Sequence, residues 1–415
     1  MAKSSNVPEI RFAGFTDPWE QRKLGELFAE SDERSSTEEI LSVSVANGIY
    51  PASESDRDTN PGASISNYKI VRVGDIVYNS MRMWQGAVGS SKYNGIVSPA
   101  YVVAKPVVEL DSTCFGYLLK RPEMLYKYLC DSQGNSKDTQ TLRYERFAEI
   151  TAEVPSTIEE QRAISNCLEG LDNLITLHQR KYDKLVAFKK AMLEKMFPKE
   201  GETVPEIRFA GFTDPWEQRK LGDCFEFLQN NTLSRSDLDA ESGCARSIHY
   251  GDILIKFGDY LGTDYASLPF ITDASVVFKY TDSTLQEGDV VFADTAEDET
   301  AGKCVELGEL PAEPVISGLH TIPARPRFVF GAGFLGHYLN SPAYHNQLLP
   351  LMQGIKVISI SKTALQDTQI HFPSVAEQSA IGLTLGRIDS LITLHQRKLE
   401  VLNNLKKAML DKMFV

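Results

Sequence analysis

The 415-residue sequence lacks the features that mark secreted, membrane-spanning or zinc-binding proteins. It contains no run of about 18 uninterrupted apolar residues, and its first residues, MAKSSNVPEI, include no apolar stretch of the kind found in secretory signals. The six cysteines form no CxxC pair, and none lies at zinc-ligand spacing from a histidine. We therefore expect a cytoplasmic protein with no membrane contact, whose cysteines are buried or incidental thiols.

Motifs of common enzyme classes are also absent. The chain contains no GxxxxGK[ST] phosphate loop, no HExxH, no GxSxG, and no pairing of a glycine-rich turn with an NPPY-type tetrapeptide. GAGFLG at residues 331–336 matches GxGxxG, but no acidic residue follows about 20 positions later and no βαβ series surrounds it. We expect a chain that is not an enzyme and that has no catalytic, cofactor-binding or metal-binding residues.

Positive charge is scarce as well, since 43 Lys and Arg face 56 Asp and Glu and the net charge is −13 at pH 7. Nonspecific affinity for nucleic acid comes from Lys and Arg that neutralise phosphates. The charge balance therefore argues against a simple DNA-coating protein. If DNA is the partner, another component has to help hold it.

What the sequence does contain is an internal repeat. VPEIRFAGFTDPWEQRKLG at residues 7–25 recurs unchanged at residues 204–222. LITLHQRK at residues 174–181 recurs at 391–398, and a KKAML segment shortly after it recurs too. The intervening residues share little beyond short strand-like fragments such as GDIVYN and GDVVFAD. A duplication that keeps its frame and loses its filling indicates two domains of equivalent construction with different variable parts. Duplication without functional meaning is the alternative.

Each half ends in a predicted long helix. Residues 159–197 contain one glycine and no proline, and their apolar positions step by about 3.5 residues, which indicates a seam buried against another helix. Residues 376–414 repeat this pattern, so the two helices most simply bury each other as an antiparallel pair. His178 and His395 fall at the same register of the seam, where each either specifies the register as a polar group or faces a partner protein. A satisfied seam histidine is the simpler interpretation, and a metal-binding or catalytic role is the alternative.

The fillings between the repeats alternate β-like runs with turns. These runs include KIVRVGDIVYN, GIVSPAYVVAKP, YGDILIKF and SVVFKY, and a helix is predicted over residues 115–129. The predicted fold class is α+β, with two globular domains joined by two long helices in an antiparallel coiled coil and an internal pseudo-twofold repeat. The predicted bounds are 1–157 and 204–374 for the domains, with a helix and linker at 158–203 and a second helix at 375–415.

Candidate DNA contacts in the first half cluster after a predicted strand. Residues 67–106 carry five basic residues against one Asp, with aromatics interleaved, which predicts a local nucleic-acid face. Asn, Arg and Gln side chains pair bidentately with base edges, and NSMRMWQG supplies all three. Ordinary loop surface remains the alternative. The candidates are Asn79, Ser80, Arg82, Trp84, Gln85, Lys92 and Tyr101, with Lys137, Arg143 and Tyr144 in the polar loop 131–147.

The second half offers a less basic set. ADTAEDETAGK at residues 293–303 has acidic side chains that can accept from cytosine amino groups, although such a run also admits a metal-dependent nuclease. The loop 351–365 shares a QG with the loop 131–147, and its small polar and basic residues suit a phosphate backbone. The candidates are Asp294, Thr295, Lys303, His320, Lys356, Ser359 and Lys362.

Trp19 and Trp216, with Arg22 and Arg219, belong to the identical repeat. Because identical side chains cannot distinguish two DNA sequences, we expect them to anchor each domain to the frame rather than to contact DNA.

Taken together, the chain resembles the specificity subunits of type I restriction-modification systems. The resemblance rests on RFxGFxxxWExxKLG, on GDIVYN or GDVVF, on LITLHQRK, and on a long helix that opens with EEQR or AEQ and ends in KKAMLxKMF. It covers the whole chain. The acidic character of residues 282–313 departs from the family's basic recognition loops and leaves the second set of contacts less defined.

The resemblance implies that each variable domain recognises half of a bipartite double-stranded DNA target. It also implies that the long helices bind two modification subunits, which carry S-adenosylmethionine-dependent adenine methylation and help contact the duplex. Restriction subunits, where present, carry cleavage, so S-adenosylmethionine and ATP are expected on the partners. The alternatives are a DNA-binding regulator that acts without enzymatic partners and a nuclease that uses the carboxylates of 294–299.

Overall fold

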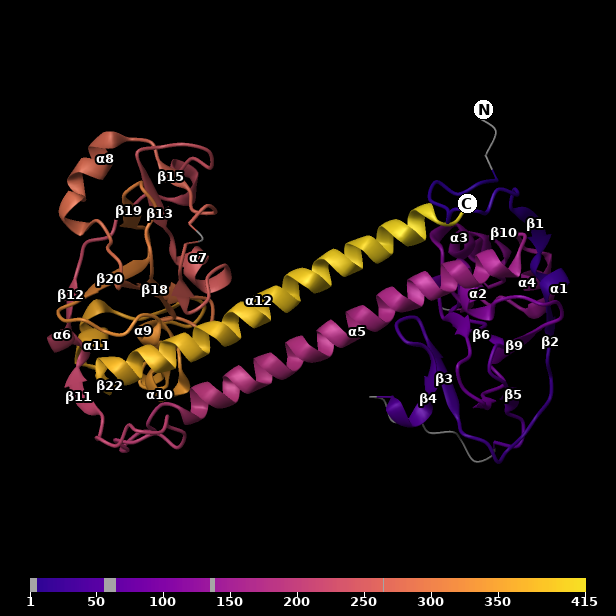
Figure 1. Ribbon diagram of the computed structural model, residues 1–415, viewed down its shortest axis with the longest axis horizontal. Coiled ribbons are helices and arrows are strands. Elements are labelled where there is room, and N and C mark those ends of the chain that lie inside the picture. Colours follow the sequence, from indigo (N-terminus) through magenta and orange to yellow (C-terminus); the bar gives the residue numbers. More distant parts are fainter. Residues whose placement is uncertain (1–5, 56–64, 135–138, 264) are drawn as a thin grey trace. The chain divides into compact units, whose positions relative to one another are not determined.

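The computed structural model describes residues 6–55, 65–134, 139–263 and 265–415, which fall into two compact units. The first unit consists of the chain up to His178 together with Lys398–Val415, and the second is Gln179–Arg397. Two long helices, α5 (Ile158–Lys195) and α12 (Val375–Lys412), each begin in one unit and end in the other (Figure 1). Both units mix helices and strands, which confirms the expected α+β class.

The first unit is built on a four-stranded antiparallel sheet with the order β2-β9-β6-β7. Successive residues of β6 point to opposite faces: Ile76 and Tyr78 join the helix-covered core, and Val77 joins a smaller cluster with the β3–β4 and β5–β8 pairs. Its elements are β1 (Glu20–Lys23), α1 (Leu24–Leu27), β2 (Phe28–Glu30), β3 (Leu41–Ser44), β4 (Gly48–Pro51), β5 (Lys69–Val71), β6 (Ile76–Asn79), β7 (Val88–Ser90), β8 (Gly95–Val97), β9 (Tyr101–Pro106), α2 (Ser112–Leu118), α3 (Pro122–Asp131), α4 (Tyr144–Glu149) and β10 (Thr151–Val154).

The second unit repeats this sheet as β12-β20-β16-β18 and adds β14 at the edge. Val290 and Phe292 of β16 face the helix-covered core, and Val291 faces the other layer, as in β6. Its elements are β11 (Glu217–Lys220), α6 (Leu221–Cys224), β12 (Phe225–Phe227), β13 (Ala245–Ile248), α7 (Tyr250–Ile255), β14 (Tyr260–Leu261), β15 (Phe270–Ile271), α8 (Ala274–Lys279), β16 (Val290–Ala293), β17 (Thr295–Ala296), β18 (Cys304–Leu307), β19 (Val315–Ser317), β20 (Thr321–Pro326), α9 (Phe334–Leu339), α10 (Pro342–His345), β21 (Ile358–Ser359), α11 (Lys362–Asp367) and β22 (Gln369–Phe372). The fillings therefore share a fold despite their dissimilar sequences.

The long helices run antiparallel within each unit. In the first unit, Asp172 of α5 pairs with Lys406 of α12 at 2.5 Å, and Met413 packs in the same core as Leu168. In the second unit, Lys189 of α5 pairs with Asp389 of α12 at 2.5 Å. The apolar seam positions are buried or half-buried, and His178 and His395 lie half-buried among them. The predicted antiparallel pair is confirmed.

The repeated segment closes the end of a long helix in each unit. The amide of Ile10 donates to the carbonyl of Lys412 at 2.9 Å, and the amide of Ile207 donates to the carbonyl of Lys195 at 2.9 Å. The last carbonyls of a helix have no partner within it, so these bonds satisfy groups that the helix leaves open. The same backbone role at both sites accounts for one sequence serving twice.

The two tryptophans anchor the domains, as predicted. Trp19 is 2% exposed and meets Phe414, beyond α12, edge to face at 5.9 Å between ring centroids. Trp216 is 3% exposed and meets Phe197, beyond α5, in the same way at 6.2 Å. Arg22 and Arg219 instead lie at the surface in ion pairs with nearby glutamates, so the anchoring expected of these two residues is wrong.

Several predicted elements need correction. The β-like runs YGDILIKF and SVVFKY form the helices α7 and α8, because the side chains of His249 and Asp273 accept hydrogen bonds from the first-turn amides and start a helix in each case. The helix predicted over 115–129 is two helices, since Pro122 begins α3. The polar loop 131–147 includes the start of α4.

Within the ranges that the structure describes, no helix combines the length and the apolar character needed to cross a membrane.

Candidate nucleic-acid interface

Three chain segments meet beside the end of β6 in the first unit. The residues after β6 begin with Ser80, whose amide donates to Ala100 just before β9 at 3.4 Å. The carbonyl of Ser80 accepts from the amide of Leu142 at 2.8 Å. Leu142 directly follows Thr141, which exchanges two backbone bonds of 3.0 Å with Gln133. Backbone hydrogen bonds to Ser80 therefore hold three chain segments together that are distant in sequence.

The second unit repeats this junction bond for bond. The amide of Asp294 donates to the carbonyl of His320 at 3.1 Å, and the carbonyl of Asp294 accepts from the amide of Ile360 at 2.8 Å. Gln353 and Ser359 exchange the corresponding backbone bonds, of 2.9 and 2.8 Å, and so close a hairpin over residues 353–359, the QG hairpin. Asp294 thus occupies the place of Ser80, and His320 that of Ala100. The backbone of the junction is repeated while its side chains differ.

In the second unit the junction surrounds an open hollow. Four of the predicted contacts line it, namely Asp294, Thr295, His320 and Ser359. The other lining residues belong to the loop 351–365: Leu351, Gln353, Val357, Ile360 and Ser361. The short strands β17 and β21 pair across it, and Thr295 Oγ1 donates to the carbonyl of Ile358 at 3.1 Å. The structure therefore brings together residues that are up to 67 positions apart in the chain.

Asp294 and His320 lie within hydrogen-bond distance in this hollow, with 3.2 Å between Asp294 Oδ1 and His320 Nδ1. Burial raises the pKa of Asp294 above its ordinary value, although His320 acts in the opposite direction. His320 has φ = 56°, and among the residues that the structure describes it is the one non-glycine with positive φ. The edge of Tyr250 contacts its ring at a centroid distance of 5.4 Å.

In the first unit, the predicted base-reading side chains lie on the segment that follows β6. Arg82 and Gln85 are joined by a hydrogen bond of 3.1 Å, and Asn79 Oδ1 accepts from the amide of Met81 at 3.0 Å. Ser80 Oγ donates to the carbonyl of Ala100 at 2.8 Å. Trp84 instead packs against the core, which makes it a support of this segment.

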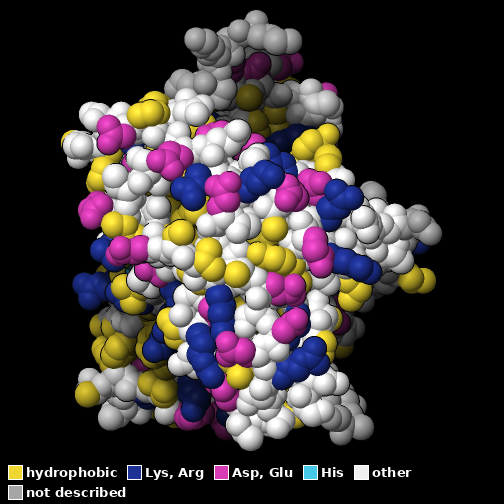
Figure 2. Space-filling view, turned by 90° about the vertical axis from the view of Figure 1, so that its right-hand side faces the viewer, with side chains coloured by type: hydrophobic (Ala, Val, Ile, Leu, Met, Phe, Trp, Pro, Cys, Tyr) yellow, Lys and Arg dark blue, Asp and Glu magenta, His cyan; other side chains and the backbone are white. Residues whose placement is uncertain are grey.

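Ion pairs neutralise most of the positive charge of the predicted basic face at residues 67–106. Lys69 is 8% exposed and pairs with Glu30 and Asp32, Arg72 pairs with Glu38, and Lys105 pairs with Glu33. The acidic partners lie between positions 30 and 38, outside the stretch in which the charges were counted. Figure 2 shows one face of the molecule, on which Lys and Arg side chains lie among Asp and Glu rather than in a separate patch.

The remaining predicted residues of the first half are dispersed. Lys92 pairs with Glu169 of α5 at 2.7 Å, and Tyr101 packs against the smaller core cluster. Tyr144 donates its hydroxyl hydrogen to the carbonyl of Phe28 at 2.6 Å, which ties α4 to β2. Arg143 is exposed at the start of α4. Lys137 lies outside the described residues.

The three predicted lysines of the second half have different surroundings. Lys303 donates to the carbonyls of Leu254 and Phe257 at 3.2 Å each, and burial lowers its pKa. It supports the loop from inside the unit and is poorly placed to contact a phosphate. Lys356 is exposed on the QG hairpin, and Lys362 is exposed at the start of α11.

Ile355 at the tip of the same hairpin is 98% exposed, and sequence reasoning missed it. The QG that precedes it was the available indication, because Gly354 has φ = 119° and turns the chain back on itself.

The family model for the type I restriction modification DNA specificity domain matches the chain twice, at residues 16–187 and 213–404. The chain belongs to this family. The specificity subunit of the type I restriction enzyme MjaVIII from Methanocaldococcus jannaschii is 24% identical over 432 residues, which cover 99% of this chain and 95% of that protein. The chain is therefore a DNA-target recognition subunit of a type I restriction-modification system, and recognition rather than catalysis is its role.

Solved structures agree on the fold. The S subunit of a type I restriction-modification system from M. genitalium superposes with a TM-score of 0.55 at 15% identity, with 99% of each chain covered. A chain from a structural study of type I R-M complex assembly gives a TM-score of 0.50 at 16% identity, covering 97% of this chain and 99% of that one.

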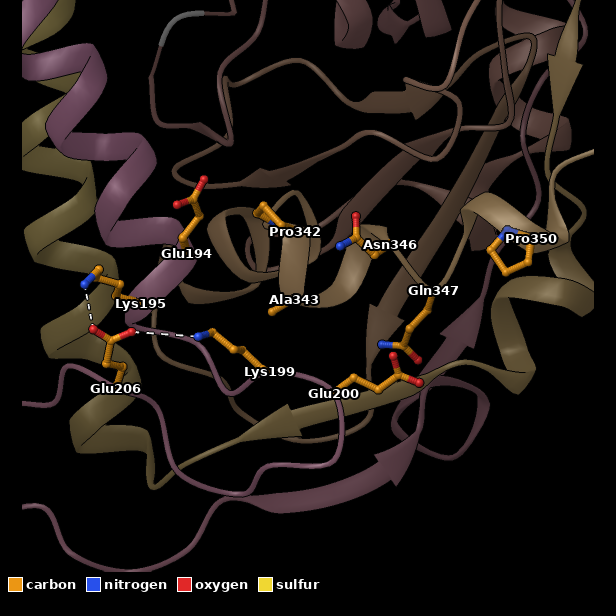
Figure 3. A pocket seen from close by; sticks show the side chains of 10 residues that line it. All are labelled: Glu194, Lys195, Lys199, Glu200, Glu206, Pro342, Ala343, Asn346, Gln347 and Pro350. Carbon is orange, nitrogen blue, oxygen red and sulfur yellow. Dashed lines mark hydrogen bonds and ion pairs between the residues drawn. The ribbon is translucent and has the colours of Figure 1, made fainter.

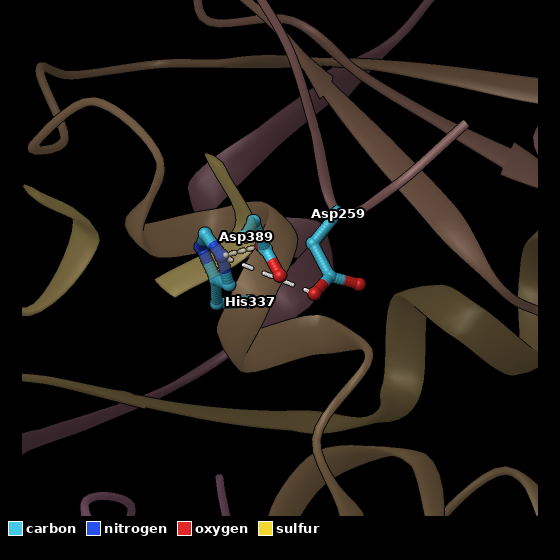
Figure 4. Close-up of side chains that lie close together, drawn as sticks. All are labelled: Asp259, His337 and Asp389. Atoms are coloured by element: carbon cyan, nitrogen blue, oxygen red, sulfur yellow. Dashed lines mark hydrogen bonds and ion pairs between the residues drawn. The ribbon is translucent and has the colours of Figure 1, made fainter. Parts of the chain in front are cut away.

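A cluster of charged residues in this specificity subunit resembles a metal site at first sight. Asp259, His337 and Asp389 face one another (Figure 4), and their ligand atoms lie within 4.8 Å. Lys189 occupies the position that a cation would take, with its amino group 2.7 Å from Asp259 and 2.5 Å from Asp389. Burial opposes the protonation of His337, but its hydrogen bond to Asp389 and the nearby Asp259 together raise its pKa. The cluster is a salt-bridge network that joins α5, α9 and α12.

The first unit has a simpler version of this network. Asp172 accepts from Lys406 at 2.5 Å and from the hydroxyl of Tyr117 at 2.7 Å. Tyr117 of α2 thus takes the part that His337 plays in the second unit. Each network fixes the register of the two long helices beside its own domain.

The GxGxxG match also has a structural explanation. The amides of Gly333 and Gly336 both donate to the carboxylate of Glu306, at 2.7 and 2.8 Å. A Cβ on Gly336 would lie 1.9 Å from the carbonyl oxygen of Asp259, so only glycine fits there. These amides bind a buried side chain of the subunit itself.

Another hollow of the second unit lies beside the end of α5 and α10 (Figure 3). Three of its charged residues pair with one another, since Glu206 contacts Lys195 at 2.6 Å and Lys199 at 3.9 Å. None of the predicted contacts lines it, so it is not a candidate site.

Proposed function

We propose that this specificity subunit recognises a two-part double-stranded DNA target, with one half recognised by the loop junction of each unit. The observation that carries the proposal is the repeated junction, in which the same backbone hydrogen bonds hold different side chains. Because the backbone of the junction is the same in both units, the loops have the same arrangement in each. Their side chains differ, so the two units present different hydrogen-bonding groups to base edges. Such an arrangement suits two adjacent recognition sites of unrelated sequence.

The proposed contacts are those predicted residues whose side chains remain available at each junction. Asn, Gln and Arg suit base edges, and exposed Lys, Arg and Ser suit phosphates. In the first unit these are Asn79, Ser80, Arg82, Gln85 and Arg143, and in the second they are Asp294, His320, Lys356, Ser359 and Lys362. Thr295 is 7% exposed and its hydroxyl is bonded to Ile358, so it supports the junction instead.

We further propose that two modification subunits bind the long helices and carry out adenine methylation in the cytoplasm. The support comes from identical exposed leucines in the two units: Leu174 and Leu177 of α5 are 45% and 46% exposed, and Leu391 and Leu394 of α12 are both 45% exposed. Two equal apolar surfaces suit two copies of one partner, because the same contacts are offered twice.

S-adenosylmethionine and ATP belong, in this proposal, to the modification subunits and to restriction subunits where the system has them. The charge of the chain is consistent with this division. With a net charge of −13 and four of the five basic residues of 67–106 in ion pairs, the subunit contributes base recognition while its partners supply much of the phosphate contact.

Co-expression with the modification subunit of the same system, followed by genome-wide mapping of methyladenine, tests the proposal. We expect a gapped two-part motif that is absent when this chain is omitted. Continuous motifs, or methylation that does not depend on this chain, would contradict it.

A further inference from the structure

We propose that Asp294, oriented by His320, selects a C·G base pair in the second half of the target by accepting a hydrogen bond from the cytosine amino group. This inference rests on the proposed function and adds to it one specificity-determining residue, its positioning residue and the base pair they select.

The backbone of Asp294 is fixed on both sides. Its amide is held by His320 and its carbonyl by Ile360, so the side chain leaves the end of β16 in one direction and lines the hollow with Thr295 and Ser359. The side chain is 29% exposed, which leaves part of the carboxylate accessible from outside. A group held this way can discriminate between bases, because it cannot move away from a mismatched edge without breaking the junction.

The chemistry of a carboxylate narrows its possible contact on DNA. It is repelled by phosphates, and the base-edge groups that it can bind are amino groups. Acidic side chains accept from cytosine N4 in the major groove, whereas adenine is characteristically recognised by the paired donor and acceptor of Asn or Gln. Among the described residues, His320 is the basic side chain that contacts Asp294, and no Lys or Arg forms an ion pair with the Asp294 carboxylate.

His320 is held in a conformation that serves this contact. With φ = 56° it occupies a region that non-glycine residues adopt at a cost, and such positions concentrate at functional sites. Tyr250 supports the ring from one edge, and Nδ1 lies 3.2 Å from Asp294 Oδ1. A hydrogen on Nδ1 binds that oxygen and leaves Oδ2 to accept from the base.

The equivalent positions of the first unit carry Ser80 and Ala100, which provide neither a carboxylate nor an imidazole. The pair is therefore a difference between two otherwise equal junctions. We infer that its effect is confined to the second half of the target.

Methylation mapping of the full complex distinguishes this inference from the proposed function. The variants are Asp294→Asn and, as a matched control, Asp298→Asn, which removes one negative charge from the same loop but does not line the hollow. We expect Asp294→Asn to change the preferred base at one C·G position of the second half and to leave the first half unchanged. Asp298→Asn should leave the motif unchanged. A wild-type motif that is two-part but has no C·G position in its second half would overturn the inference alone, while a wild type with no two-part motif would overturn the proposed function.

Binding measurements then test whether the cytosine amino group is the atom group that Asp294 contacts. In duplexes, each cytosine of the second half is replaced in turn by 2-pyrimidinone, which lacks the amino group. We expect the wild-type complex to lose roughly tenfold or more in affinity at one position. Asp294→Ala should bind both duplexes equally, and equal discrimination by the wild type and Asp294→Ala would overturn the assignment.

The role of His320 is tested by two replacements that both tolerate positive φ. His320→Gly removes the donor and should reduce the discrimination, while His320→Asn, which can donate, should restore part of it. Thermal unfolding of both variants separates loss of folding from loss of orientation. Equal discrimination by His320→Gly and the wild type would remove the positioning role.

Discussion

Arg11 donates two hydrogen bonds to the carboxylate of Glu160, at 2.6 and 2.8 Å, and Arg208 repeats them on Glu377 at 2.7 and 2.8 Å. Both glutamates are 1% exposed and lie in the first turn of a long helix. The bidentate pair thus ties each repeated segment to the helix that leaves its own domain, and this contact requires Arg rather than Lys.

Removing the arginine should leave a buried carboxylate without its charge partner. We expect Arg11→Ala to destabilise the first unit and Arg208→Ala the second, each by about 3–5 kcal/mol. Lys23→Ala is the control, because its pair with Glu149 is exposed and should contribute little. Denaturant unfolding of each variant provides the comparison, and an effect of Arg11→Ala no larger than that of Lys23→Ala would mean that the pair is not structural.

Exchange of residues 26–157 for those of another specificity subunit should change one half of the methylated motif and keep the other. The reason is that the frame contacts, such as Trp19 on Phe414, lie outside the exchanged segment. Methyladenine mapping gives the result directly. If both halves changed, the two junctions would not act independently.

Charge placed on the repeated leucines should remove the partners one at a time. We expect Leu177→Asp and Leu394→Asp each to weaken the binding of one modification subunit by about tenfold to hundredfold, since burial of a leucine contributes about 1.5–3 kcal/mol. Phe278→Asp, at an 83% exposed position of α8, is the control. Native mass spectrometry counts the bound copies, and loss of both copies in a single variant would contradict two separate sites.

The carboxyl group of Glu306 should make the second unit less stable as the pH rises. Burial raises its pKa from 4.5 to about 7, although the amides of Gly336 and Gly333 oppose the shift. Because the folded state holds the proton more tightly than the unfolded state, the stability contributed is complete below pH 4.5 and is lost as the pH rises through about 7. The difference is on the order of 3 kcal/mol.

The measurement is thermal unfolding at pH 5 and pH 8, and the variant is Glu306→Gln. Part of the decrease seen in the wild type should disappear in Glu306→Gln, which carries no titrating proton at that position. The same pH dependence in both proteins would place the responsible group elsewhere, with His337 the next to examine because its pKa is also raised.

The architecture was predictable because repeats and helix periodicity are properties of neighbouring residues. The long helix expected over 159–197 spans Ile158–Lys195, and its partner begins at Val375. Local patterns failed where a single capping side chain decided the outcome, as His249 does for α7. Apolar residues in short runs fit a strand or a helix equally well, so the cap determined which one formed.

The site was harder to predict because its residues are joined only by the fold. Counting charges over 67–106 missed the acids at positions 30–38, which neutralise that stretch across the sheet. Asp294 and His320 could each be singled out by residue type, but their pairing depends on the meeting of β16 and β20. The short distance between these two side chains cannot be derived from a single sequence.

The salt bridges between the two long helices also bear on how the chain arose. Asp172 and Lys189 are as far apart on α5 as Asp389 and Lys406 are on α12, and each aspartate pairs with the lysine of the other helix. Either half therefore carries both complementary groups, and two copies of one half could satisfy each other without the second half. The two halves are therefore self-complementary at these positions, as expected if one half-length chain was duplicated.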